Sequence, residues 1–222
     1  MSAYIHIVDG VPASLPLGKI VCVGRNYADH AKELNNPVPQ EPVLFIKPST
    51  ALADLGEPVE IPTAWGSCHF EAEMTVLIGQ PLTRCSEQQA ADAIAGVGIG
   101  LDLTLRDLQA ELKQQSLPWE KAKAFDDACP LSDFVTVPAF ELQDQQIQLR
   151  QNGQLKQDGN SADMITPVLP LLVYISQFFT LQPGDTVLTG TPAGVGPLAL
   201  GDELQLNLST KLNITTHIIE RS

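Results

Sequence analysis

The fold is decided by the stretch Cys68-His69-Phe70-Glu71-Ala72-Glu73-Met74-Thr75-Val76-Leu77-Ile78, which predicts a β-strand. Alternate side chains of a strand point to opposite faces, so Glu71 and Glu73 share one face. With a rise of about 3.3 Å per residue, they lie roughly 6 to 7 Å apart at the backbone. Paired carboxylates beside a core need a proton or a cation to relieve desolvation and repulsion. The pair therefore indicates a divalent metal site, with the solvent face of an edge strand as the alternative.

Composition limits the class of protein. The chain has 222 residues, is 44% hydrophobic and carries a net charge of -13. This length suits one domain over residues 1–222, with residues 1–19 as a lead-in. The acidic balance argues against nucleic acid and anionic membranes as partners. The four scattered cysteines, the absence of a signal-peptide pattern and the lack of a long apolar span predict a cytoplasmic protein that binds small molecules.

Short β-rich runs dominate the chain, many of them bounded by Pro or Gly. They predict strands over 20–23, 43–46, 71–78, 134–137, 147–149, 185–188 and 203–219, the last with a break near Ser209. Asn152-Gly153 predicts a tight two-residue hairpin turn. Helical periodicity predicts helices over 28–34, 87–95 (capped by Ser86), 104–115 and 169–178. These elements predict an α+β fold built mainly of mixed or antiparallel sheet.

A third carboxylate follows the glycine-rich run at residues 96–100. That run does not match a dinucleotide-binding loop, because Leu101 stands where a third glycine is required; small residues here let a buried strand pass close to its neighbours. Asp102 on its own is most simply a helix N-cap. Arg106 and Gln109 follow at intervals of four and three, so they can line one face with Asp102. Three carboxylates suit a hard ion such as Mg²⁺ or Mn²⁺.

Two further segments carry candidate polar groups. Lys121 and Lys123 stand close together in a chain with few cations, and we expect Lys121 to be a solvated lysine. A strand over residues 185–188 leads into a loop rich in Gly and Pro, which is either a tight turn or a place where backbone N–H groups and the Thr191 hydroxyl meet an anion.

Several stretches together resemble the fumarylacetoacetate hydrolase superfamily, in its small acylpyruvase-like branch. They run in the family's order through about residues 20–203, and they are GRNYADH at 24–30, EPVLFIKP at 41–48, HFEAE at 69–73, LDLTLRD at 101–107, PWEKAKAFD at 118–126 and TGTP at 189–192 with GVG at 194–196. One departure is visible. Relatives often carry two histidines before the paired glutamates, whereas this chain has His69-Phe70.

The resemblance implies a mixed β-roll, the fumarylacetoacetase C-terminal-like fold with a few short helices, and a homodimer. It implies Mg²⁺ or Mn²⁺ held by Glu71, Glu73 and Asp102, and a catalytic dyad of His30 and Glu33 on a lid. It also implies a set of side chains that contact a small 2-oxo acid, in which Lys123 additionally stabilises developing negative charge: Arg25, Arg106, Gln109, Lys123 and Thr191.

The implied function is metal-dependent hydrolysis of the C–C bond of short acylpyruvates, which yields pyruvate and a carboxylic acid. The same enolate also permits decarboxylation or tautomerisation of oxaloacetate. An isomerase or decarboxylase of 2-oxo-dienoates from aromatic degradation is the nearest alternative. A metal-stabilised scaffold without turnover is the alternative from a different class.

Overall fold

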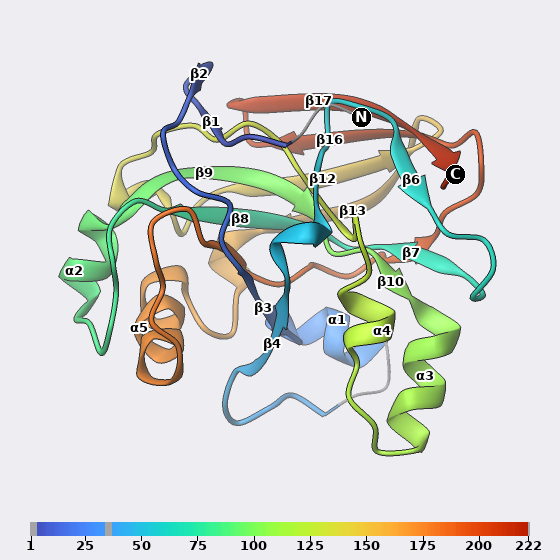
Figure 1. The fold of residues 1–222 in the computed structure, drawn as a ribbon, viewed down its shortest axis with the longest axis horizontal. Coiled ribbons are helices and arrows are strands. Elements are labelled where there is room, and N and C mark those ends of the chain that lie inside the picture. Colours follow the sequence, from blue (N-terminus) through green and yellow to red (C-terminus); the bar gives the residue numbers. More distant parts are fainter. Residues whose placement is uncertain (1–3, 34–36, 222) are drawn as a thin grey trace.

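The computed structural model describes residues 4–33 and 37–221, and its fold is the expected α+β arrangement, a mixed β-roll with short helices (Figure 1). A seven-stranded sheet has the order β4 (Val43–Lys47), β3 (Ile20–Gly24), β14 (Thr186–Leu188), β8 (Ala72–Ile78), β9 (Ile94–Leu101), β11 (Cys129–Leu131) and β5 (Leu52–Asp54). A five-stranded sheet has the order β13 (Gln154–Asn160), β12 (Gln146–Gln151), β16 (Glu203–Leu208), β17 (Leu212–Glu220) and β6 (Val59–Ile61).

The remaining elements are short. Two small sheets are formed by β10 (Thr104–Leu105), β7 (Cys68–Phe70) and β15 (Gly196–Pro197), and by β1 (Ile7–Val8) with β2 (Val11–Pro12). The α-helices are α1 (Ala28–Glu33), α2 (Glu87–Asp92), α3 (Arg106–Gln114), α4 (Glu120–Lys123) and α5 (Val168–Phe178), and the 3-10 turns are Ser49–Ala51, Ala139–Glu141 and Ser161–Asp163. None of the described helices is long and apolar enough to cross a bilayer.

Strand β8 lies at the centre of the molecule. It pairs with β14 on one side and β9 on the other, and all of its residues are buried. The alternative of a solvent-facing edge strand is therefore excluded. Close packing also explains the glycines of β9, because a Cβ at Gly100 would lie 2.4 Å from Leu131 Cδ2. The expected close passage of a buried strand is confirmed.

The predicted strands are largely confirmed, with two corrections. The strand over 71–78 begins at Ala72, since the chain changes sheet at Glu71. The strand over 134–137 is wrong, because Phe134 and Val135 form only isolated bridges. Instead, β11 pairs at residues 129–131, where a proline hid it from the sequence pattern. The hairpin turn at Asn152-Gly153 is confirmed by φ angles of 52° and 76°.

The predicted helices are also confirmed in part. Ser86 caps α2 in a capping box with Gln89, but this helix ends at Asp92 because the chain soon enters β9. Helix α3 begins at Arg106 with Leu105 as its N-cap, so the N-cap interpretation of Asp102 is wrong. The predicted end of the first helix, at residue 34, lies outside the described residues.

Short helices lie on one side of the central strands β8 and β9, and two long strands lie on the other side (Figure 1). In Figure 1, α1, α3 and α4 lie together below the long strands β8 and β9, and β16 and β17 lie above these strands. The side chains described next come from the strands and from these three helices.

Candidate active site

Strand register brings the three predicted carboxylates together. Ala72 pairs with Leu101 and His69 pairs with Thr104, so Glu71 lies opposite Asp102, whose N–H donates to Glu71 O at 2.9 Å. Glu73 lies two residues along β8. One oxygen from each of the three carboxylates lies within 4.8 Å of the other two, and all three residues are buried.

Lys123 pairs with two of the three carboxylates. Its Nζ lies 2.8 Å from Glu71 Oε2, 2.6 Å from Asp102 Oδ2 and 2.6 Å from Thr104 Oγ1. An ammonium group has three protons to donate, so all of its donors are committed to protein oxygens. In this structure Lys123 therefore pairs with the carboxylates, and its contact with a substrate stays a prediction.

Sequence reasoning missed a second buried cation. Lys47, at the end of β4, is completely buried, and its Nζ lies 2.7 Å from Asp102 Oδ1. It also donates to Ala128 O at 2.8 Å and to Leu103 O at 3.3 Å. A lysine that closes the apolar run VLFIK was the available signal, since a charge next to a buried strand needs a partner.

The two glutamates differ in their protonation. Burial opposes the charge of Glu71, but Lys123 and Arg106 together outweigh it and hold the pKa of Glu71 below its usual range. Burial, followed by the charges of Asp102 and Glu71, raises the pKa of Glu73 well above its usual range. Glu73 is thus the carboxylate that lacks sufficient positive charge nearby.

The cluster fits a hard divalent ion. All of its donors are oxygens, which Mg²⁺ and Mn²⁺ prefer, and Glu73 is a buried carboxylate that such an ion would neutralise. Two separate stretches of the chain supply the donors, as the sequence analysis expected: Glu73 lies in β8, Glu71 directly precedes β8, and Asp102 directly follows β9. The acidic triad can hold a metal, and the identity of the ion stays a prediction.

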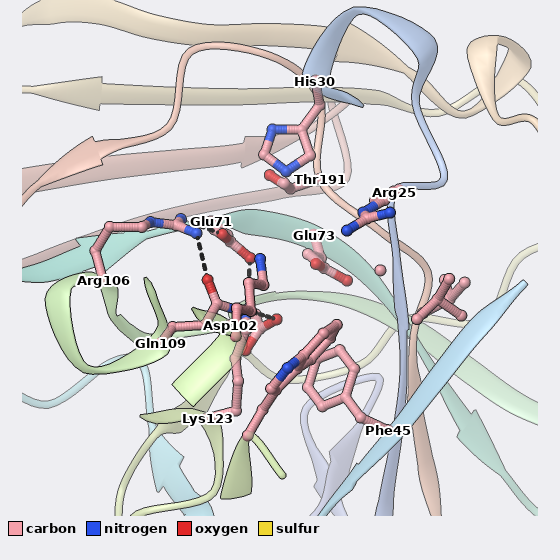
Figure 2. A pocket seen from close by; sticks show the side chains of 15 residues that line it. Arg25, His30, Phe45, Glu71, Glu73, Asp102, Arg106, Gln109, Lys123 and Thr191 are labelled. Atoms are coloured by element: carbon pink, nitrogen blue, oxygen red, sulfur yellow. Dashed lines mark hydrogen bonds and ion pairs between the residues drawn. The ribbon is translucent and has the colours of Figure 1, made fainter. Parts of the chain in front are cut away.

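His30 and Glu33 lie on the other side of the cavity. His30 Nδ1 is 3.4 Å from Glu33 Oε2, and His30 is only 5% exposed. Glu33 also accepts hydrogen bonds from Gly194 N at 3.1 and 3.2 Å, which ties α1 to the loop after β14. Figure 2 shows His30 above Thr191, with its ring directed towards the carboxylates.

The other predicted contact residues are partly engaged by the protein. Arg106 binds Glu71 Oε1 and donates to Gln109 Oε1 at 2.9 Å. Thr191 donates its hydroxyl proton to Ala72 O at 2.8 Å, and it accepts from Gln157 Nε2 at 2.7 Å. Gln109 keeps its NH₂ group without a protein acceptor among the described residues, so this group remains available to a ligand.

Gln157 is a further residue that the sequence analysis missed. It is completely buried on β13, accepts from Ala72 N at 2.9 Å and donates to Pro192 O at 2.8 Å. Through these bonds and its bond to Thr191 it joins the five-stranded sheet to the site. A glutamine in a polar hairpin carries no local sequence signal for this role, because the contacts are long-range.

A single pocket collects nearly all of these side chains. Nine of the ten predicted site residues line it (Figure 2). The tenth, Glu33, does not line the pocket but contacts His30. Phe45 and Trp119, whose ring centroids are 6.3 Å apart, form an aromatic wall. The free volume is about 40 Å³, which is room for roughly three water molecules.

Fold and site together define a class of enzyme. Residues 19–219 match the family described as "Fumarylacetoacetate (FAA) hydrolase C-terminal", and the chain belongs to this family. This confirms the resemblance seen in the sequence.

The chain is similar to one named relative in sequence and to two named relatives in structure. The chain is 50% identical over 216 residues to "Oxaloacetate tautomerase YcgM" of Escherichia coli (strain K12), covering 96% of this chain and 98% of that protein. It is similar in structure to the fumarylpyruvate hydrolase of Pseudomonas aeruginosa in complex with Mn²⁺ and pyruvate, with a TM-score of 0.91, 30% identity and coverage of 100% and 97%. It is also similar to the 2-hydroxyhepta-2,4-diene-1,7-dioate isomerase of Mycobacterium marinum, with a TM-score of 0.81, 34% identity and coverage of 95% and 77%.

Proposed function

We propose that this chain is a divalent-metal-dependent enzyme that interconverts the keto and enol forms of oxaloacetate. The observation that carries the proposal is its 50% identity, over almost the full length of both proteins, to one named oxaloacetate tautomerase. Tautomerisation removes a proton from carbon 3 and delivers one to the oxygen on carbon 2, and it breaks no carbon–carbon bond. We prefer tautomerisation to the acylpyruvate hydrolysis that the sequence motifs favoured.

The carboxylates of Glu71, Glu73 and Asp102 are the groups proposed to hold the ion. When bound, Mg²⁺ or Mn²⁺ supplies Lewis-acid polarisation of the keto group and of the adjacent carboxylate. A relative that was solved with Mn²⁺ and pyruvate, a 2-oxo acid, supports this choice. Lys123 and Lys47 would hold Asp102 in position for the ion.

The proton transfers fall to His30. Its Nδ1 faces Glu33, so Nε2 is the nitrogen available to the pocket. A hydrogen bond from Nδ1–H to Glu33 would fix the tautomer in which Nε2 accepts the carbon 3 proton, and the Glu33 carboxylate would stabilise the imidazolium that forms. The same nitrogen can return the proton to the carbon 2 oxygen. The NH₂ group of Gln109 and the guanidinium of Arg106 would bind the carboxylate at carbon 1, and both residues line the pocket.

Hydrolysis of acylpyruvates is the second candidate. The structural similarity to fumarylpyruvate hydrolase favours it, and His30 would then take a proton from water instead of from carbon. The similarity to a dienoate isomerase supports proton transfer without hydrolysis. A scaffold without turnover is the least supported alternative, because all three of these relatives are named as enzymes. The single domain, the homodimer and the cytoplasmic location stay predictions.

Steady-state assays with purified protein test the proposal. We expect keto–enol conversion of oxaloacetate to exceed pyruvate release from both oxaloacetate and acetylpyruvate. A chelator should lower conversion about 100-fold or more, and added Mg²⁺ or Mn²⁺ should restore it. Full activity in the chelator would contradict the metal requirement. Faster pyruvate release from acetylpyruvate than tautomerisation of oxaloacetate would assign the enzyme to the second candidate.

A further inference from the structure

The cations that line the pocket form two groups. Arg106 and Lys123 are paired with the carboxylates of Glu71 and Asp102. Arg25 and Lys113 line the same pocket, yet neither forms an ion pair within residues 4–33 and 37–221. The resemblance to the family gave Arg25 only a general contact with a 2-oxo acid, and the proposed proton transfers use neither residue. Two positive charges that line the pocket therefore have no carboxylate partner among the described residues.

Lys113 is held in place by an aromatic ring. It stands in the last turn of α3, and its Nζ lies 5.0 Å from the centroid of the Trp119 ring. Burial, followed by the charges of Arg25 and Arg106, lowers the pKa of Lys113 to about 8. The nearby guanidinium groups thus add to the effect of burial, and the ammonium form still dominates at neutral pH. An anion bound here would offset their repulsion.

Arg25 is held by its backbone. It follows β3 directly and has a φ of 62°, in the left-handed region that side chains other than glycine rarely adopt. Its neighbour Asn26 locks this turn, because it accepts from Thr166 N and donates to Thr189 O, both at 2.8 Å. Strained residues of this kind gather at ligand sites. Figure 2 shows the Arg25 guanidinium reaching into the cavity from the side opposite to Arg106 in this view.

We propose that Arg25 and Lys113 form a subsite for the second carboxylate of a dicarboxylic 2-oxo acid. The inference rests on the proposed function, since it assumes that the 2-oxo acid end of the ligand lies at Glu71, Glu73 and Asp102. A chain with a net charge of -13 repels a dianion at long range, so recognition requires local cations. An acylpyruvate with an apolar tail would leave both cations unpaired.

Two probes of equal chain length isolate the second carboxylate. 2-Oxoglutarate ends in a carboxylate, whereas 2-oxopentanoate ends in a methyl group. Calorimetric titration into Mn²⁺-loaded protein should show at least about tenfold tighter binding of 2-oxoglutarate, the range of a charge-assisted hydrogen bond. Arg25→Gln and Lys113→Gln should each remove most of this preference. Both should leave the dissociation constant of 2-oxopentanoate within about threefold of the original value. Arg25→Lys should keep part of the preference.

Lys121→Gln is the matched control, because it removes one exposed charge from the neighbouring helix. It should not change either affinity. Mn²⁺ affinity and the melting temperature, measured for every variant, show whether its fold is intact. Arg25→Gln and Lys113→Gln alter different parts of the chain, the residue after β3 and helix α3. Equal binding of the two probes to the unaltered protein would overturn the subsite. So would variants that weaken both probes equally. Failure of the Mn²⁺-loaded protein to bind either probe would instead overturn the proposed function.

Discussion

The carboxylates at the floor of the pocket lie in or next to the buried strands β8 and β9, whereas His30 and Glu33 at its roof come from a six-residue helix. We define the floor as Glu71, Glu73 and Asp102 with Lys47 and Lys123, and the roof as α1. An isolated helix of this length is not stable, so the roof depends on its neighbours. One such tie is the pair of bonds from Gly194 N to Glu33.

Floor and roof are therefore proposed to have different roles: the floor binds the metal, and the roof transfers the proton. Floor residues are surrounded by the core, and buried cations balance the charges of Glu71 and Asp102, so a change there alters both folding and metal binding. The roof contributes one imidazole through a 3.4 Å contact and little of the core. A change there should affect the rate and leave the fold intact. Each region can therefore be tested by a variant that spares the other.

The largest effect is expected at Lys47 in the floor. Lys47→Met removes a completely buried cation from Asp102 Oδ1 and keeps most of the side-chain volume. We expect a loss of about 3 to 5 kcal/mol in the free energy of unfolding, because Asp102 Oδ1 and two buried carbonyl oxygens lose their donor, although Lys123 still pairs with Asp102 Oδ2. Denaturant unfolding in a chelator measures this loss.

The exposed Lys121 provides the control for that experiment. Lys121→Met should change the free energy of unfolding by less than about 0.5 kcal/mol. Equal stability of the Lys47 and Lys121 variants would show that the floor does not depend on its buried cation.

The second test concerns the roof. His30→Gln should lower the turnover number by roughly 10² to 10⁴, the usual contribution of a positioned general base. The Mn²⁺ dissociation constant, measured by calorimetry, should stay within about threefold, since His30 is not among the proposed ligands. Lys32→Gln, on an exposed position of the same helix, should leave both values unchanged. A large loss of Mn²⁺ affinity in the His30 variant would show that the roof also contributes to metal binding.

The same division explains how much could be predicted from the sequence. Strand periodicity alone placed Glu71 and Glu73 on one face. The structure buries both residues, and buried paired carboxylates need a cation or a proton. Asp102 carried a weaker local signal, because its position opposite Glu71 depends on the pairing of two strands far apart in the chain. The sequence pattern even favoured an N-cap for Asp102. Spacing suggested that the three carboxylates suit one hard ion, and the resemblance to a family assigned them as its ligands.

The roof and the supporting residues were harder to predict. His30 and Glu33 lie at positions of a short polar helix that would otherwise be assigned to the surface, so only the family motif indicated them. Lys47 and Gln157 were missed because their partners lie 55 and 85 positions away, at Asp102 and Ala72. Local patterns report which face is buried, and they do not report which polar groups meet inside the core.

The smallest expected effect compares two glutamates within the floor. Burial and the neighbouring carboxylates raise the pKa of Glu73 above its ordinary value of 4.5, so the protonated form suits the fold. Its favourable contribution is present below 4.5 and is lost as the pH rises through the folded pKa. Glu73→Gln should therefore stabilise the metal-free protein by on the order of 1 kcal/mol near neutral pH. Glu71→Gln should act in the opposite direction, because Lys123 and Arg106 overcome the cost of burial and lower the pKa of Glu71.

Thermal unfolding in a chelator, followed from acidic to neutral pH, measures both variants. The advantage of Glu73→Gln should disappear as the pH falls below 4.5, and the cost of Glu71→Gln should fade when the pH drops below the same ordinary value. Added Mn²⁺ should stabilise the unaltered protein more than either variant, because each variant removes one proposed ligand. If both variants destabilise the metal-free protein equally at neutral pH, Glu73 already has enough positive charge around it. The case for a bound cation would then lose its main electrostatic support.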